Sequence, residues 1–204
     1  MKKIVFKSNF YFLLIAFLYS CSAPILKKDE GIVKSFTKGT VAVLPFDNQS
    51  NDITAETMLR DMVVERFVKK GWIVIKNEIV DEKLKGAGIV DGGQLNMLKP
   101  QEISKLLEAD YLCYGYINDF KLQNLGFIIN KKVELEIKIV DGKTEEVVFN
   151  MTGVGQDMKV YFKKEEAKKA FAENMALKLV QNIMKRPLYN ESVVAVSKIF
   201  AKIP

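Results

Sequence analysis

The chain of 204 residues contains no histidine, one tryptophan and only two cysteines, Cys21 and Cys113. The absence of histidine excludes histidine-based catalytic triads, a histidine general base and histidine metal ligands. Two cysteines are too few for the cysteine cluster of a structural zinc site. No catalytic constellation remains in the sequence, so we predict a non-enzymatic protein without a metal or a cofactor.

The chain also lacks a strong charge of one sign. Its formal net charge is +6, but three lysines lie in the first 20 residues, and the remaining chain has 28 basic and 25 acidic residues, a net of +3. It contains no aromatic-basic RNA motif. We therefore expect no nucleic-acid partner.

A long membrane-spanning run is missing as well. The stretch from residue 8 to residue 26 has no charge but is interrupted by the polar or helix-breaking residues Asn9, Ser20, Ser22 and Pro24. A basic start, an apolar core over residues 10–18 and a small-residue exit are typical of a secretory signal. An uncleaved anchor is the alternative.

The exit Leu18-Tyr19-Ser20-Cys21 resembles the bacterial lipobox, although Tyr19 is unusual at its position. The resemblance implies that residues 1–20 are removed and that Cys21 becomes a fatty-acylated amino terminus. Ser22 then favours the outer membrane over the inner membrane, which is the alternative, and the domain faces the periplasm. Residues 21–39 are lysine-rich with two glycines and predict a tether. Acylation of Cys21 would leave Cys113 without an intrachain partner, as a buried small apolar residue.

The fold is organised around residues 41–46, a short apolar run that predicts a strand buried on both faces. Residues 53–70 predict an amphipathic helix with Arg60 on its charged outer face. A second buried strand over residues 72–75 completes a right-handed βαβ unit. Short helices follow over residues 78–85, capped by Asn77, and over residues 101–109, beginning after Pro100.

Three strands come next. Residues 111–123 predict a long strand with Leu112, Phe120 and Leu122 on one face. Residues 132–139 alternate strictly, and Asp141-Gly142 predicts a hairpin to a strand with Val147 and Phe149 inward. The last helix covers residues 165–185, with an inward stripe of Ala167, Phe171, Met175, Leu179 and Ile183. Residues 188–204 form an amphipathic tail that could dock on the body, touch membrane or bind a partner.

The order β-α-β-α-α-β-β-β-α predicts an α/β (α+β) domain over residues 40–187, with a mixed sheet of about five strands. It resembles the amino-terminal domain of TolB and the related folds of CsgG and LpoB. More closely, it resembles a family of Gram-negative envelope lipoproteins of unknown function. The matching pieces are residues 41–45, 48–52, 70–72, 79–81, 109–110 and 140–144.

The resemblance implies a partner-binding accessory subunit of a trans-envelope transport or secretion assembly, anchored to the membrane by lipid. The alternatives are an LpoB-like activator of a peptidoglycan synthase and a CsgG-like export-channel protomer, and homo-oligomerisation is compatible with each. Asp47, Asn48 and Asn51, in the polar loop after the first strand, are the predicted partner contacts; a simple turn-and-cap role explains them equally well. An open sheet edge is a second predicted contact.

Overall fold

The computed structural model describes residues 31–184 and 186–204. Within this range Gly31–Pro204 forms one compact unit. The predicted signal segment, the predicted acylation site Cys21 and the first part of the predicted tether lie outside the described residues. The compact unit begins nine residues earlier than the predicted domain and includes the predicted tail.

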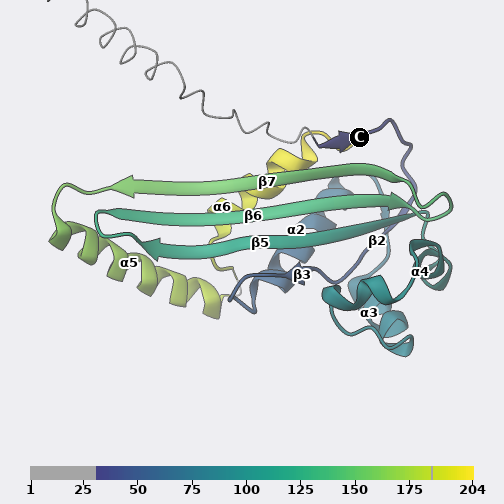
Figure 1. Ribbon diagram of the computed structural model, residues 1–204, viewed down its shortest axis with the longest axis horizontal. Helices are drawn as coiled ribbons and strands as arrows, with labels where there is room; N and C mark the ends of the chain where they lie inside the picture. Colours follow the sequence, from purple (N-terminus) through teal and green to yellow (C-terminus); the bar gives the residue numbers. More distant parts are fainter. Residues whose placement is uncertain (1–30, 185) are drawn as a thin grey trace, which may run out of the picture. The chain divides into compact units, whose positions relative to one another are not determined.

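The centre of the unit is a seven-stranded mixed sheet in the order β1-β7-β6-β5-β2-β4, with β3 paired to β5 (Figure 1). Its parallel pairs are β2 with β4, β2 with β5 and β3 with β5, and the remaining pairs are antiparallel. The strands are β1 (Ile32–Val33), β2 (Thr40–Val43), β3 (Asp47–Asn48), β4 (Ile73–Val74), β5 (Tyr111–Asn124), β6 (Ile128–Asp141) and β7 (Val147–Val160). The predicted mixed α/β fold is confirmed, and the two strands beyond the predicted five are the short β1 and β3.

Strand β2 is buried on both faces, as its unbroken apolar run predicts. Residues Val41 to Leu44 are fully inaccessible to solvent. Its neighbour β4 differs from the prediction of a second buried strand: it has two residues at the sheet edge, and Ile73 is 67% exposed. Only Trp72, just before β4, is buried, where it packs edge-on against Phe67 and Tyr111.

Helices cover the two faces of the sheet and create two separate apolar clusters. Helices α2 (Ala55–Lys69) and α6 (Tyr189–Phe200) pack on one face, while α3 (Asn77–Gly86), the 3-10 helix η2 (Gly92–Met97) and α4 (Pro100–Leu107) cover the other. Figure 1 shows α3 and α4 near one end of the long strands and α5 (Lys164–Ile183) near the other. Pro100 begins α4 as predicted. Asn77 is the first helical residue of α3 rather than its cap, and its side chain donates to Asp61.

Two bulges interrupt the alternation that the sequence predicts. The register of β5 against β6 shifts at Asn118, between Ile117 and Asp119, so that Phe120 lies on the face of Ile117 and not of Leu112. A second shift, at Val148, places Val147 in the opposite cluster from Phe149. One extra residue in a strand reverses every side chain beyond it, which explains both errors.

Helix α6 crosses β7 at two glycines. A methyl group on Gly153 would come within 2.1 Å of the Ala195 carbonyl oxygen, and one on Gly155 within 1.8 Å of the Glu191 carbonyl oxygen. The backbones can approach this closely because neither glycine has a side chain. The final segment therefore docks on the body, which is one of the three possibilities that the sequence left open for it, and Trp72 Nε1 donates to the carbonyl oxygen of Pro204 at 3.3 Å.

Candidate functional site

The three predicted partner contacts lie at the carboxyl end of β2, where parallel α/β sheets commonly bind ligands. Asp47 and Asn48 form β3 and pair with Tyr116 and Ile117 of β5. Asn48 Oδ1 accepts hydrogen bonds from the backbone N–H and the hydroxyl of Ser50, while its Nδ2 donates to the Asp52 carbonyl oxygen at 2.9 Å. The Asn48 amide therefore stabilises the turn.

The other two predicted residues are less constrained by the turn. Asp47 Oδ1 accepts a hydrogen bond of 2.7 Å from Gln49 Nε2 near the surface. Asn51 is exposed to solvent. The loop thus combines a local turn with an accessible polar rim.

Asp52 connects this loop to helix α5. One carboxylate oxygen accepts hydrogen bonds from the backbone N–H and hydroxyl of Thr54, and the other lies 2.9 Å from Lys178 Nζ. The two side chains are only 12% and 18% exposed. Burial opposes ionisation of Asp52, but the bonds from Thr54 and Lys178 outweigh it and hold the pKa of the carboxyl below its usual range.

The second half of helix α5 has its polar side turned toward the body and its apolar side toward solvent. Lys178 reaches Asp52, its ammonium lies 5.7 Å from the Phe120 ring, and Gln181 Oε1 accepts the Leu188 N–H. Of the predicted inward stripe only Ala167 is fully buried. We call the exposed apolar side chains of its second half the α5 surface: Met175, Leu177, Leu179, Val180, Ile183 and Met184, 39% to 83% exposed.

A cleft of about 450 Å³ separates the loop from the bulge in β5. Gln49, Asn51 and Lys178 line it together with residues 118–123. The predicted loop and helix α5 are therefore neighbours, joined by the Asp52–Lys178 ion pair through the inward side of the helix.

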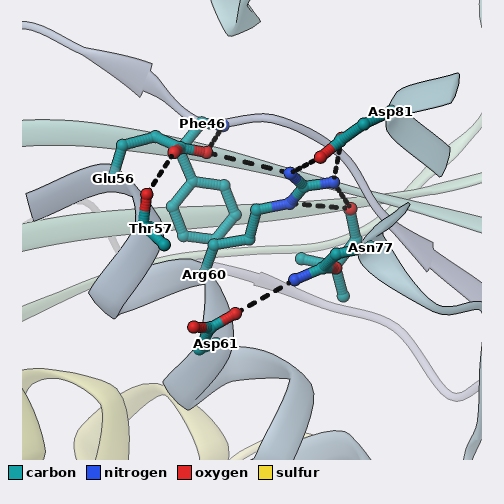
Figure 2. Close-up of polar contacts among 8 residues, drawn as sticks. Phe46, Glu56, Thr57, Arg60, Asp61, Asn77 and Asp81 are labelled. Atoms are coloured by element: carbon teal, nitrogen blue, oxygen red, sulfur yellow. Dashed lines mark hydrogen bonds and ion pairs between the residues drawn. The ribbon is translucent and has the colours of Figure 1, made fainter. Parts of the chain in front are cut away.

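A second feature is the buried guanidinium of Arg60, which Figure 2 shows between Asp81, Glu56 and the backbone of β2. It forms a bidentate pair with Asp81 at 2.7 and 3.0 Å, and Nε and Nη2 both donate to the Val43 carbonyl oxygen. Glu56 lies 4.0 Å away and accepts the Phe46 N–H.

Arg60 supplies the hydrogen bonds that a longer β4 would otherwise donate to β2. Two residues earlier on the same edge of β2, the Val41 carbonyl oxygen accepts the Ile75 N–H. Val43 faces the same edge but lies beyond the end of β4, so Arg60 supplies the donor. The expected outward position of Arg60 was wrong, because its side chain is only 6% exposed. It also lines a cleft of about 640 Å³, but its pairing with Asp81 and Val43 indicates a structural role.

Another cleft, of about 720 Å³, lies on the other side of Asp47, between η2, α4 and the sheet. Lys138 Nζ sits over the rings of Tyr114 and Tyr116 and donates to the Tyr116 hydroxyl at 2.9 Å. Burial raises the pKa of Tyr114 to about 12, so its phenol stays protonated at neutral pH and is no general base. Among the described residues no group of three or more Cys, Asp or Glu is placed to hold a metal ion.

The family follows from comparison with known proteins. A family model described as "Putative lipoprotein GNA1162-like" matches residues 32–198. The chain belongs to the GNA1162-like family. The match includes most of α6, so the final segment is shared with the family rather than particular to this chain. No protein with a curated description matches by sequence.

Solved structures give the same fold. Lipoprotein GNA1162 from Neisseria meningitidis is 12% identical, with a TM-score of 0.55 over 71% of this chain and 99% of that one. The LpoB carboxyl-terminal domain from Salmonella enterica is 13% identical, with a TM-score of 0.44 over 60% and 86%. The PelC dodecamer from Paraburkholderia phytofirmans is 15% identical, with a TM-score of 0.36 over 70% and 89%. The last two scores are too low to carry an argument, so the GNA1162-like family alone bears on function.

Sequence reasoning located the loop but missed the part that α5 plays. A lysine inside a helix is expected in solvent, so Lys178 carried no signal for a contact with a residue 126 positions earlier. No helix of the described residues has the length and apolar character needed to cross a bilayer.

Proposed function

We propose that this protein is a non-enzymatic envelope lipoprotein that binds a protein partner through the α5 surface and the adjoining loop of Asp47, Asn48 and Asn51. Acylation of Cys21 anchors it to the outer membrane with the domain facing the periplasm. There it acts as an accessory subunit of a trans-envelope assembly. One partner compatible with this function is a peptidoglycan synthase, which is the partner of an LpoB-like activator.

The exposed apolar side of α5 is the observation that carries the proposal. Surface helices normally bury their apolar stripe against the body. Here the Asp52–Lys178 pair turns the polar side inward, leaving Leu179 60% and Ile183 83% exposed. A contiguous exposed apolar patch with a polar rim marks a site of interaction.

Charge argues for a protein partner at this surface. Residues 170–184 carry one lysine and one glutamate, and the lysine is Lys178, which is already paired. An exposed apolar helix face with a single charge, Glu173, complements an apolar groove or helix of another protein. An anionic lipid surface or a nucleic acid would require a basic patch instead.

The anchor would increase the effectiveness of a weak contact. Confining the domain to the plane of a membrane raises its effective concentration for a partner held in the same compartment. Two or three acyl chains hold a protein firmly, since each buried methylene contributes about 0.8 kcal/mol. A modest α5 interface is then sufficient for stable association.

Site-specific crosslinking tests the proposal. A photoreactive residue at Leu179 should trap one envelope protein in intact cells, whereas the same residue at Val90, 66% exposed between α3 and η2, should not. The adduct should disappear with Ile183→Asp and weaken with Cys21→Ser. Equal trapping at both positions, or trapping only of a second copy of this chain, would reject the proposal.

A further inference from the structure

The far end of the long strands carries a second exposed apolar group, distinct from the α5 surface. We call it the tip: Leu125, Phe127, Met158, Val160 and Phe162, which are 58%, 49%, 58%, 61% and 96% exposed. The strand register places these residues at one end of the sheet, because Ile128 pairs with Val160 and the Phe127 carbonyl oxygen accepts the Tyr161 N–H at 2.7 Å. The end of β7 therefore lies beside the β5–β6 hairpin.

Lysines surround the tip. The two segments that form it, residues 121–132 and 157–169, contain eight lysines and three acidic residues. Asp119 and Glu134, just outside the first segment, pair with Lys121 and Lys132, and counting them gives a net charge of +3. Residues 31–204 as a whole have 26 basic and 23 acidic residues, also a net of +3. The rest of the domain is thus neutral, and the basic character of the compact unit is concentrated at one end.

Among these lysines, three lie next to the exposed aromatic and aliphatic side chains. Lys159 and Lys164 are exposed, and Lys163 is 74% exposed with one acidic neighbour, Glu166 at 3.4 Å. Apolar side chains beside lysines are the combination that binds the interface of an anionic bilayer. The apolar groups enter the boundary of the acyl chains while the ammonium groups remain among the phosphates.

We propose that the tip inserts into an anionic phospholipid surface and is a second membrane contact besides the acyl anchor. A second copy of the chain is disfavoured as the occupant, because two tips with a net charge of +3 each repel each other. The two apolar surfaces of the domain therefore have different partners: the neutral α5 surface a protein, and the basic tip a lipid headgroup layer.

The length of chain before the domain allows the anchor and the tip to share one bilayer; this step rests on the proposed acylation of Cys21. Ile32 pairs with Asn150 of β7, and Val160 lies ten residues further along that strand, or about 33 Å away. Ten residues separate Cys21 from Gly31, and an extended chain of that length reaches about 33–36 Å. The tether is long enough to reach the level of the tip.

Vesicle binding tests the tip without the anchor. The protein is the chain from residue 21 onward with Cys21→Ser, which retains the whole compact unit Gly31–Pro204. It should co-sediment with vesicles containing phosphatidylglycerol, release with increasing salt and bind poorly to pure phosphatidylcholine. Replacing Phe127 and Phe162 together by serine should weaken binding at least about 10-fold, because two aromatic side chains no longer enter the bilayer.

Two further variants distinguish the contribution of the lysines from that of exposed apolar residues elsewhere on the domain. Lys159→Gln with Lys163→Gln and Lys164→Gln should weaken binding to anionic vesicles only. The matched control, Leu179→Ser with Ile183→Ser on the α5 surface, should bind as the parent does. Fluorescence of the single tryptophan, Trp72, which is 4% exposed, verifies that each variant is folded.

The inference would be overturned by no binding to the anionic vesicles, by unchanged binding of the phenylalanine variant, or by an equal loss of binding in the α5 control. The protein could also bind heparin as tightly as it binds the anionic vesicles, with the same affinity in the parent and in the phenylalanine variant. That result would show a purely electrostatic surface and would also overturn the inference. Crosslinking at Leu179 is independent of these measurements, so failure of the tip leaves the partner-binding proposal standing.

Discussion

Removal of the Arg60 side chain is the perturbation whose cost can be worked most directly from the contacts. Arg60→Met keeps the apolar stem but leaves the Val43 carbonyl oxygen without the two donors that now reach it. An unsatisfied buried acceptor costs about 1–3 kcal/mol. Asp81 is 49% exposed and can be rehydrated, so loss of the ion pair adds at most about 1 kcal/mol. We expect a loss of about 2–3 kcal/mol in the free energy of unfolding.

The partner substitution should be milder. Asp81→Ala removes the countercharge, but Arg60 still donates to Val43 and has Glu56 at 4.0 Å. We expect a loss of about 1 kcal/mol, and the double variant should be no less stable than Arg60→Met alone. The matched control is the exposed pair Glu65–Lys69 on the same helix, 66% and 69% exposed, whose removal should change stability by less than about 0.5 kcal/mol.

Urea denaturation followed by the fluorescence of Trp72 measures all four variants, since this single tryptophan is buried against Phe67 and Tyr111. Arg60→Met within 0.5 kcal/mol of the parent would refute the donor role. Strict additivity of the two substitutions would show that Arg60 and Asp81 do not act as a pair.

Three further predictions concern other parts of the fold. Gly155→Ala should lower the free energy of unfolding, measured by urea denaturation, by several kcal/mol, because its methyl group meets the Glu191 carbonyl oxygen. Gly86→Ala is the control and should be neutral, because no atom lies within 4 Å of the added methyl group. Equal losses in the two variants would contradict the close packing of α6 on β7. Burial raises the pKa of the Cys113 thiol, so it should react with a thiol reagent only after unfolding, and rapid labelling of the native protein would disprove its burial. The pKa of Asp52 is lowered, so the contribution of its ion pair to docking of α5 is present above pH 3.8 and is lost as the pH falls below that value. Protease cleavage within α5 should therefore increase at low pH. Lys178→Met should remove this pH dependence.

Local pattern predicted most of the sheet. The strict alternation of β6 was correct at Val133, Leu135, Ile137 and Ile139, all fully buried, because one face of that strand packs on α6 and α2 while the other is polar. The bulges at Asn118 and Val148 have no such pattern, since an extra residue is visible only when the partner strand is known. Alternation therefore predicted the strands but not the face of every residue along them.

The candidate site was harder to predict because its determinants are long-range. Arg60 has a carbonyl partner only because β4 ends after two residues, and the length of an edge strand is not encoded near Arg60. The direction of α5 depends on Asp52, far away in the chain. The loop of Asp47, Asn48 and Asn51 could be located from turn-forming residues alone, while the helix beside it could not.

The mass of the mature amino terminus tests the central claim most directly, because the proposed compartment, the tether and the partner all depend on it. The protein should be purified from the membranes of a Gram-negative cell and its amino-terminal peptide measured by mass spectrometry. We predict a peptide that begins at Cys21 and carries a diacylglyceryl group on sulfur. A peptide that begins at Met1, with the Cys21 thiol unmodified, would contradict the account.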